Sequence, residues 1–260
     1  FRAFAHSNVL VLVNLSTLLR QTSQALFFPQ TCVLCDQWVL NRDFSPLCPT
    51  CRLSLREHSQ SICYYCGIPL PGSISEIQET CSVCKAGTTP FDFARSYGPY
   101  AGNLRKVIWK FKFGGCRHLV HPLSAILESS LSHGTLHASP SWIVPVPAHP
   151  SRKRTRGIDQ TALLSRALSR RSGIPVFSGL RRVKPTQPQS GLNVQQRLKN
   201  LQKAFRLSGE LQLADRDILI VDDIWTTGVT VAEVCRLLRR QTDAEKIIVV
   251  TLARVSRRHP

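Results

Sequence analysis

The sequence predicts an α/β protein in which a parallel sheet with helices on both faces follows a small cysteine-rich module. Three observations support this prediction. Hydrophobic and charged residues make up 43% and 19% of the chain, so it can bury a core. Strand and helix patterns alternate after residue 90, whereas four closely spaced cysteine pairs precede it. With 260 residues, the chain has room for one α/β domain and one smaller module, at about 100–200 residues per domain.

Residues 1–27 form an N-terminal segment with one marked apolar run, at residues 9–19. Asn14 interrupts this run and Arg20 ends it, so it is shorter than the about 20 residues that a membrane-spanning helix needs. No small-residue cleavage site follows in residues 21–24. We therefore expect a short amphipathic helix, no membrane span and a cytoplasmic location.

Residues 28–90 carry eight of the ten cysteines, arranged as four C-x2-C pairs: Cys32 and Cys35, Cys48 and Cys51, Cys63 and Cys66, and Cys81 and Cys84. This spacing lets two thiolates on one tight turn point at the same metal ion, and two such turns complete a tetrahedral shell of four sulfur atoms. A redox dithiol is normally a single pair, and a disulfide framework requires a secreted context that the N-terminal segment does not supply. The module is therefore predicted to be a double zinc ribbon with two structural zinc ions.

The spacing leaves open which pairs share an ion, because sequential and interleaved pairing use the same ligands. In either case the thiolate shells are full, which argues against hydrolytic zinc chemistry. A segment of this size buries little apolar area, so metal binding is expected to supply much of its folding free energy. The two remaining thiols, Cys116 and Cys235, are isolated in sequence and are expected to be ordinary packing residues.

Residues 91–260 show the alternation of a doubly wound parallel sheet. Helical spacing of apolar residues occurs at 104–113, 119–131, 161–168 and 231–238. Short apolar runs at 142–146, 218–221 and 247–252 are typical of buried parallel strands.

The clearest chemical motif is Asp222-Asp223-Ile224-Trp225-Thr226-Thr227-Gly228-Val229-Thr230, at the carboxyl end of the 218–221 strand. Ligands bind at this end of the strands in open α/β sheets. The threonine hydroxyls of Thr226, Thr227 and Thr230 and the positive end of the next helix converge on one phosphate, and Gly228 lets the backbone approach closely. The adjacent carboxylates can accept hydrogen bonds from the vicinal hydroxyls of a ribose. A solvated strand end followed by a capped helix is the simpler alternative.

Residues 218–230 resemble the 5-phosphoribosyl-1-pyrophosphate signature of type I phosphoribosyltransferases. From about Phe28 the chain resembles the ComF family of competence proteins, which join a double zinc ribbon to such a domain. Further stretches match that family: Tyr97-Gly98-Pro99-Tyr100, Lys112 with Gly114-Gly115, Val144-Pro145-Val146-Pro147, Arg156-Gly157, Gln160, Thr186, Gln189, Arg197, Asn200, Ala204 and Phe205. One departure is Ile158-Asp159, where the family usually has Phe-Asn.

The resemblance implies several further ligand contacts. The loop after Val146 resembles the pyrophosphate loop, and its guanidinium groups suit bidentate phosphate binding; a solvated basic turn is the alternative. Its basic residues are Arg152, Lys153, Arg154 and Arg156. Residues 184–205 resemble the hood that closes over the ligand, with Lys184, Gln189, Arg197 and Asn200 as polar candidates. Lys112 is assigned to the same ligand, and Mg2+ is expected to accompany it.

The chain carries 34 Lys and Arg against 16 Asp and Glu, a formal charge of +18, which favours a polyanionic partner such as nucleic acid. Solubility and an anionic small ligand are the alternative explanation. The resemblance implies a phosphoribosyl-pyrophosphate-binding protein of natural transformation, with single-stranded DNA and other DNA-uptake proteins as candidate partners. The alternatives are an active phosphoribosyltransferase of nucleotide or base salvage and a regulator that senses the ligand. No segment identifies an acceptor base, so the sequence leaves open whether the protein is an enzyme.

The Lys and Arg residues of the cysteine-rich module are candidate DNA contacts. So is the predicted helix 104–113, because basic and aromatic residues alternate along it. The basic residues are Arg105, Lys106, Lys110 and Lys112, and the candidate stacking groups are Trp109, Phe111 and Phe113. The alternative is that these aromatic residues belong to the core side of an amphipathic helix.

Overall fold

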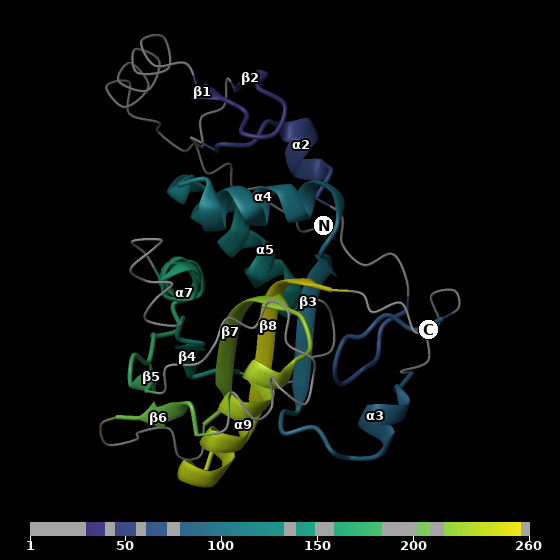
Figure 1. Ribbon diagram of the computed structural model, residues 1–260, viewed down its shortest axis with the longest axis vertical. Coiled ribbons are helices and arrows are strands. Elements are labelled where there is room, and N and C mark those ends of the chain that lie inside the picture. Colours follow the sequence, from purple (N-terminus) through teal and green to yellow (C-terminus); the bar gives the residue numbers. More distant parts are fainter. Residues whose placement is uncertain are drawn as a thin grey trace, which may run out of the picture.

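The computed structural model describes residues 30–39, 45–55, 61–71, 79–132, 139–148, 159–183, 201, 203–208 and 216–255 (Figure 1). The predicted amphipathic segment 1–27 lies outside these residues. None of the helices in the described ranges is long and apolar enough to cross a membrane.

A four-stranded parallel sheet forms the centre of the chain, in the order β3-β8-β7-β4. The strands are β3 (Phe93–Pro99), β4 (Trp142–Pro145), β7 (Ile218–Trp225) and β8 (Ile247–Arg254). The two inner strands begin with long apolar runs, which suit a sheet buried on both faces. The predicted α/β fold class is confirmed.

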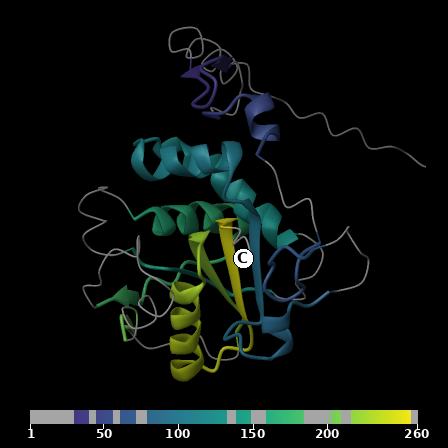
Figure 2. The same cartoon turned by 45° about the vertical axis from the view of Figure 1, so that its right-hand side comes forward.

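Helices cover both faces of this sheet (Figures 1 and 2). The helices are α4 (Gly102–Phe113), α5 (Val120–Ser132), α7 (Gln160–Ser172) and α9 (Val229–Gln241), with a 3-10 turn η1 (Arg117–Leu119) before α5. Alternate strand residues face opposite sides: Leu219 and Ile248 join the core cluster with α4, α5 and α7, whereas Ile218 and Val249 join the cluster with α9. Each face is therefore a separate hydrophobic layer.

Within residues 91–260, three of the described strands escaped the sequence-based prediction. Edge strand β3 contains Arg95, Gly98 and Pro99, so it lacks the continuous apolar run that reveals β7 and β8. The other two, β5 (Leu180–Arg182) and β6 (Phe205–Leu207), are short and pair antiparallel with each other. They flank residues 184–200, most of the predicted hood, which lie outside the described residues.

The cysteine-rich module contains the same local elements twice. In the first half, β1 (Gln30–Thr31) pairs antiparallel with β2 (Trp38–Val39), and α2 (Pro49–Leu53) follows. In the second half, an antiparallel bridge joins Ile62 to Pro69, and α3 (Ser82–Lys85) follows. Each half therefore consists of a hairpin followed by one helical turn.

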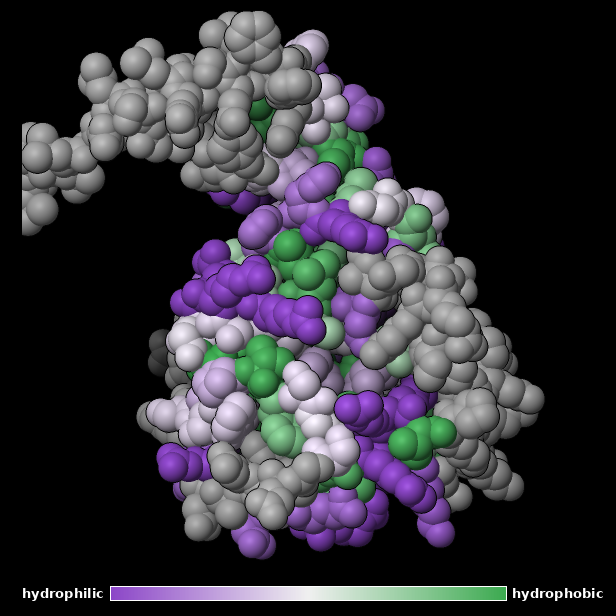
Figure 3. Space-filling model, turned by 90° about the vertical axis from the view of Figure 1, so that its left-hand side faces the viewer, coloured by the Kyte–Doolittle hydropathy of each residue, from purple (hydrophilic) through white to green (hydrophobic). Residues whose placement is uncertain are grey.

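The described residues coloured in Figure 3 do not form one broad apolar area. Hydrophobic residues form small clusters there, with hydrophilic residues between them. This distribution agrees with a charge that is spread along the sequence rather than concentrated in one tract.

Candidate ligand site and metal centres

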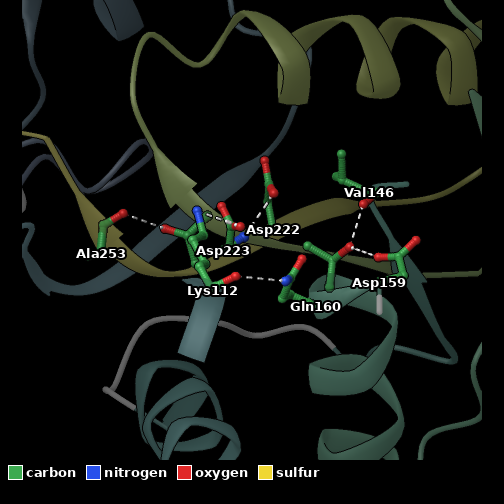
Figure 4. Close-up of polar contacts among 9 residues, drawn as sticks. Lys112, Val146, Asp159, Gln160, Asp222, Asp223 and Ala253 are labelled. Carbon is green, nitrogen blue, oxygen red and sulfur yellow. Dashed lines mark hydrogen bonds and ion pairs between the residues drawn. The ribbon is translucent and has the colours of Figure 1, made fainter. Parts of the chain in front are cut away.

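The two acidic residues lie in the carboxyl half of β7 (Figure 4). Strand β4 pairs with β7 only as far as Pro145 opposite Val221, whereas β8 continues beside β7 to its last residue. Asp222 and Asp223 therefore stand just beyond the end of β4, at the carboxyl edge of the sheet where ligands bind in this architecture. The strand runs four residues further than the apolar run predicted, to Trp225.

The last turn of α4 brings Lys112 to this acidic pair. Nζ of Lys112 lies 2.6 Å from Oδ2 of Asp223, and the two side chains point toward each other (Figure 4). Gln160, buried at the start of α7, donates a 3.4 Å hydrogen bond to the carbonyl oxygen of Lys112. The site thus combines residues from α4, β7 and α7 that are far apart in sequence.

Asp222 has an unusual titration behaviour for an aspartate. Burial and the adjacent charge of Asp223 raise the pKa of its carboxyl group to about 7, although the Asp223 backbone N–H, Lys112 and Arg182 act in the opposite direction. The carboxyl group therefore exchanges its proton near neutral pH. A carboxylate of this kind gains from a ligand that donates hydrogen bonds to it.

The turn after β7 leads directly into α9. Gly228 adopts a left-handed conformation, with φ of 76°, immediately before the first residue of the helix. A Cβ atom at Gly228 would lie 2.8 Å from the Trp225 ring, so both the backbone angle and the packing require glycine. Oγ1 of Thr227 accepts a 3.4 Å hydrogen bond from the N–H of Val229. The turn thus leads into the N-terminal end of α9, and helix N-termini are common anion sites in proteins.

The Trp225 ring packs against this turn at Gly228 and in turn contacts two neighbouring side chains. The guanidinium carbon of Arg254 lies 4.3 Å from the centre of the Trp225 ring, and the ring of Phe91 meets it edge-on at 5.6 Å. Arg254 is buried and also donates a hydrogen bond to the carbonyl oxygen of Cys66. The turn is therefore connected through Trp225 and Arg254 to the second cysteine cluster.

Asp159 caps α7 at the position where the sequence departs from the family pattern. Its Oδ1 accepts a 3.2 Å hydrogen bond from the N–H of Ala162, and the Thr161 hydroxyl lies 2.8 Å from the same oxygen. Aspartate is as good an N-cap as asparagine, so the replacement preserves the start of the helix. Its neighbour Ile158 lies outside the described residues.

The structure groups the eight paired cysteines sequentially. One tetrad is Cys32, Cys35, Cys48 and Cys51, and the other is Cys63, Cys66, Cys81 and Cys84; within each, the sulfur atoms lie within 4.8 Å of one another. Zn–S bonds of about 2.3 Å place tetrahedral ligands about 3.8 Å apart. The distances Cys35 Sγ to Cys48 Sγ and Cys66 Sγ to Cys81 Sγ are both 3.7 Å, so the tetrads suit two structural zinc ions.

Backbone groups prepare the first thiol of each tetrad for metal binding. Burial opposes ionisation of Cys32, but hydrogen bonds from the backbone of Cys48, Leu34 and Cys35 lower the pKa of its thiol to about 6. Burial likewise opposes ionisation of Cys63, and the backbone of Cys66, Cys81 and Tyr65 lowers its pKa to about 7. The thiolate is the form that binds zinc.

Comparison with known proteins assigns both halves of the chain. Residues 24–87 match the family described as double zinc ribbon domain, and residues 157–260 match the phosphoribosyl transferase domain family. The chain is 32% identical over 236 residues to Competence protein F of Haemophilus influenzae, an alignment that covers 88% of this chain and 98% of that protein. The chain belongs to the ComF family.

Two other members of the ComF family are similar over most of their length. DNA utilization protein YhgH of Escherichia coli K12 is 32% identical over 219 residues, covering 83% of this chain and 93% of that protein. Competence protein ComFC of Bacillus subtilis is 25% identical over 247 residues, covering 86% of this chain and 94% of that protein. The similarity therefore spans the cysteine-rich module as well as the sheet.

Not every predicted contact of this ComF chain falls within the described residues. Asp222, Asp223, Gly228 and Lys112 come together at one end of the sheet, with Thr226, Thr227 and Thr230 in the adjoining turn and helix. The candidate basic residues Arg152, Lys153, Arg154 and Arg156 lie outside the described part, as do the hood residues Lys184, Gln189, Arg197 and Asn200.

The predicted DNA-binding helix α4 needs two corrections. Phe111 is buried in the core, so it cannot stack on bases. Lys112 is ion-paired with Asp223, so it points to the acidic pair and is largely withdrawn from solvent. Trp109 and Phe113 are exposed, and their ring centroids lie 5.8 Å apart. These two rings are therefore still candidates for stacking on bases.

Sequence patterns did not single out Arg254, the buried cation between the second tetrad and Trp225. It sits at the end of a strand whose residues are all buried, and a charged residue in such a run is the signal that could have revealed it.

Proposed function

We propose that this chain binds 5-phosphoribosyl-1-pyrophosphate with Mg2+ and acts in DNA uptake, where it also binds single-stranded DNA. The observation that carries the first part is the acidic pair at the carboxyl end of β7, held beside Lys112 and followed by the Gly228 turn into α9. This combination provides a ribose site and a phosphate site in adjacent positions.

In this proposal the 5-phosphate of the ligand lies in the turn at residues 226–230. The hydroxyl groups of Thr226, Thr227 and Thr230 and the N–H groups at the start of α9 bind its oxygens. No lysine occupies the position found in nucleoside triphosphate loops, which favours a monophosphate.

The ribose hydroxyls then lie against Asp222 and Asp223. Lys112 pairs with Asp223 and favours the ionised form of Asp222, in which the carboxylate accepts hydrogen bonds from ribose hydroxyls. Mg2+ with Arg152, Arg154 and Arg156 would neutralise the pyrophosphate.

The role in DNA uptake rests on the relatives and on charge. The similar proteins are named for competence and for DNA utilization, and they align with this chain over nearly their whole length. The formal charge of +18 suits binding to a DNA backbone.

A double substitution tests the ligand site. Asp222→Asn with Asp223→Asn should abolish binding of phosphoribosyl pyrophosphate in calorimetric titration, because an amide cannot replace two carboxylates as acceptors for ribose hydroxyls. The matched control is Asp243→Asn with Glu245→Gln, which removes two exposed carboxylates at the other end of β8 and should bind the ligand as the unmodified protein does. An unchanged titration curve for a folded, zinc-loaded acidic-pair variant would overturn the site assignment.

A second candidate function is phosphoribosyl transfer in base or nucleotide salvage, which the match to the phosphoribosyl transferase domain family favours. In that reaction the bond between C1 of the ribose and pyrophosphate breaks as the acceptor nitrogen bonds to C1. Incubating the protein with the ligand, Mg2+ and individual nucleobases, and measuring pyrophosphate release, separates the two functions. Release that depends on one base and on the acidic pair would establish transfer; ligand binding without release supports the binding role.

A further inference from the structure

A groove lies at the end of the sheet opposite to the acidic pair. It follows the first residues of β3 and β8 and the end of α9, and α3 lies at the same end of the sheet (Figures 1 and 2). Its larger part has a volume of about 700 Å³, within the range of about 300–1,000 Å³ typical of ligand sites. Tyr65, Lys85, Phe93 and Lys246 are among the residues that line it.

A second cavity of about 390 Å³ continues the groove along α9. The two parts share Thr89, Phe91 and Asp92 in their walls, so they lie next to each other. Arg236, Arg239 and Arg240 line this second part.

One wall of the groove is a fixed aromatic platform. The rings of Tyr65 and Phe93 are stacked, with centroids 6.1 Å apart and planes inclined by 15°. Tyr64 meets both rings edge-on, at 5.1 Å from Tyr65 and 5.5 Å from Phe93. Tyr65 is 41% exposed, although its ring contacts both Tyr64 and Phe93.

The charge of the groove is strongly positive. Two lysines line the larger part and three arginines the smaller part, against one acidic residue, Asp92. Asp92 is already engaged, because its Oδ2 accepts a hydrogen bond from the N–H of Ile247 and pairs with Arg239. Of the other basic residues, Arg236 pairs with Glu233 at 3.6 Å, while Lys85 and Arg240 are exposed.

We infer that this groove binds single-stranded DNA. Unpaired bases stack on exposed aromatic rings, and a row of basic side chains follows the phosphates, which is how proteins bind single strands without reading sequence. The bases would lie on the Tyr65 and Phe93 wall, and the phosphates along Lys85, Lys246 and the arginines of α9. A duplex cannot use the aromatic wall, because its bases are already stacked. This inference rests on the proposed function, which supplies DNA as the partner, and it gives that partner a site.

The groove proposed for DNA is separate from the site proposed for phosphoribosyl pyrophosphate. The acidic pair stands at the carboxyl end of β7, whereas the groove follows the amino ends of β3 and β8, and all these strands are parallel. Both ligands can therefore be bound at the same time.

Fluorescence anisotropy with a labelled oligothymidine tests the groove on the full, zinc-loaded chain. The groove variant is Lys85→Gln, Lys246→Gln and Arg240→Gln, and a second groove variant is Tyr65→Leu. The competing site, the predicted face of α4, is tested with a third variant: Arg105→Gln, Lys106→Gln and Lys110→Gln. We expect the triple groove variant to bind about tenfold more weakly, and the slope of log affinity against log salt to become shallower by about 2, since each neutralised phosphate contributes about −0.7. If the groove is the site, the α4 variant should change the affinity less than about threefold. Saturating phosphoribosyl pyrophosphate should leave the affinity of the unmodified protein for oligothymidine unchanged.

The outcomes distinguish this inference from the proposed function. If the unmodified protein does not bind oligothymidine, the proposed DNA binding fails and the groove fails with it. If the unmodified protein binds but the α4 variant loses as much affinity as the groove variant, or more, the groove inference is overturned while DNA binding stands. Retained affinity in Tyr65→Leu, or tighter binding to duplex than to oligothymidine, would equally overturn it, because the aromatic wall would then have no part in binding.

Discussion

The two cysteine tetrads have the same local geometry but different surroundings. In each, the first cysteine pair forms a hairpin turn closed by matching backbone hydrogen bonds: Asp36 N–H to Cys32 O and Gly67 N–H to Cys63 O, both 2.9 Å. The third cysteine of each tetrad precedes a short helix that contains the fourth. The two halves are therefore repeats of one metal-binding unit.

The first tetrad packs against the layer formed by α4, α5 and α7. Cys32, Leu47 and Leu55 belong to that hydrophobic cluster, whereas Cys35 is exposed. Two hydrogen bonds of 2.8 Å add to this contact, from Tyr97 Oη to the carbonyl oxygen of Leu55 and from Asn103 Nδ2 to Ser54 Oγ. In both bonds the sheet domain contributes a side chain and not its backbone.

The second tetrad packs against the opposite layer and against the sheet itself. Cys63 and Cys66 are buried in the cluster that contains Ala94 and the apolar face of α9. The N–H of Ala94 on β3 donates a 2.7 Å hydrogen bond to Tyr65 O, and the buried Arg254 donates to Cys66 O. The predicted boundary at residue 90 thus separates two sequence patterns, while the hydrophobic layers continue across it.

This difference indicates that identical metal shells serve different purposes. The first tetrad covers one layer from outside. The second is part of the edge of the sheet, and through Arg254 and Trp225 it reaches the turn that we assign to phosphate. Loss of the second zinc site should therefore destabilise the sheet domain, whereas loss of the first should destabilise mainly the first half of the cysteine-rich module.

The largest expected effect comes from removing each metal site separately. Cys63→Ser with Cys66→Ser and Cys32→Ser with Cys35→Ser should each leave one zinc ion per chain, measured by metal analysis. The second-site variant leaves Arg254 and Arg95 buried without their thiolate neighbours, and an uncompensated buried charge costs about 3–5 kcal/mol. Urea unfolding of the sheet domain should therefore shift strongly in that variant and by less than about 1 kcal/mol in the first-site variant. Equal shifts would show that the two sites support the sheet alike.

A smaller effect is expected at the residue that follows each first cysteine pair. Asp36 and Gly67 both have left-handed backbones, with φ of 58° and 64°. A Cβ atom at Gly67 would lie 2.7 Å from the carbonyl oxygen of Ala94, whereas Asp36 is exposed and accommodates its own side chain. Gly67→Ala should cost about 3 kcal/mol, from the left-handed strain and the contact with β3 together. Asp36→Ala is the matched control and should cost less than about 1 kcal/mol. If chemical denaturation finds the two variants equally stable, the tight contact inferred between Gly67 and β3 is wrong.

Regular patterns made much of this arrangement predictable. The repeated C-x2-C spacing led to both metal shells, and the apolar runs of β7 and β8 led to the parallel sheet, because each pattern depends on neighbouring residues only. The acidic pair and Gly228 were found for the same reason: the strand, turn and helix that form their site are consecutive in sequence.

Contacts between distant segments were harder to predict. Local spacing did not reveal that Lys112 ends a helix beside Asp223, and only resemblance placed it at the ligand. Strand β3 is an edge strand that packs against the second tetrad, so its composition is mixed. Arg95 and Gly98 interrupt its apolar pattern. The choice between sequential and interleaved pairing of the cysteines likewise depends on packing, which C-x2-C spacing alone does not specify.

The smallest expected effects concern individual hydrogen bonds between each tetrad and the sheet domain. Arg254→Lys keeps a positive charge but loses the planar group that lies on Trp225 and donates to Cys66 O. Because a hydrogen bond from a charged group contributes about 1.5–3 kcal/mol, we expect a loss of about 2 kcal/mol in urea unfolding. Tyr97→Phe removes the 2.8 Å hydrogen bond to Leu55 O on the first-tetrad side and should cost about 1 kcal/mol, the usual contribution of a neutral bond. The two variants should also differ in ligand binding: Arg254→Lys loosens the ring on which Gly228 rests and should weaken phosphoribosyl pyrophosphate severalfold, whereas Tyr97→Phe should leave that affinity unchanged with both zinc ions retained. A larger loss of affinity in Tyr97→Phe than in Arg254→Lys would reverse the comparison and place the support of the phosphate turn on the first tetrad instead.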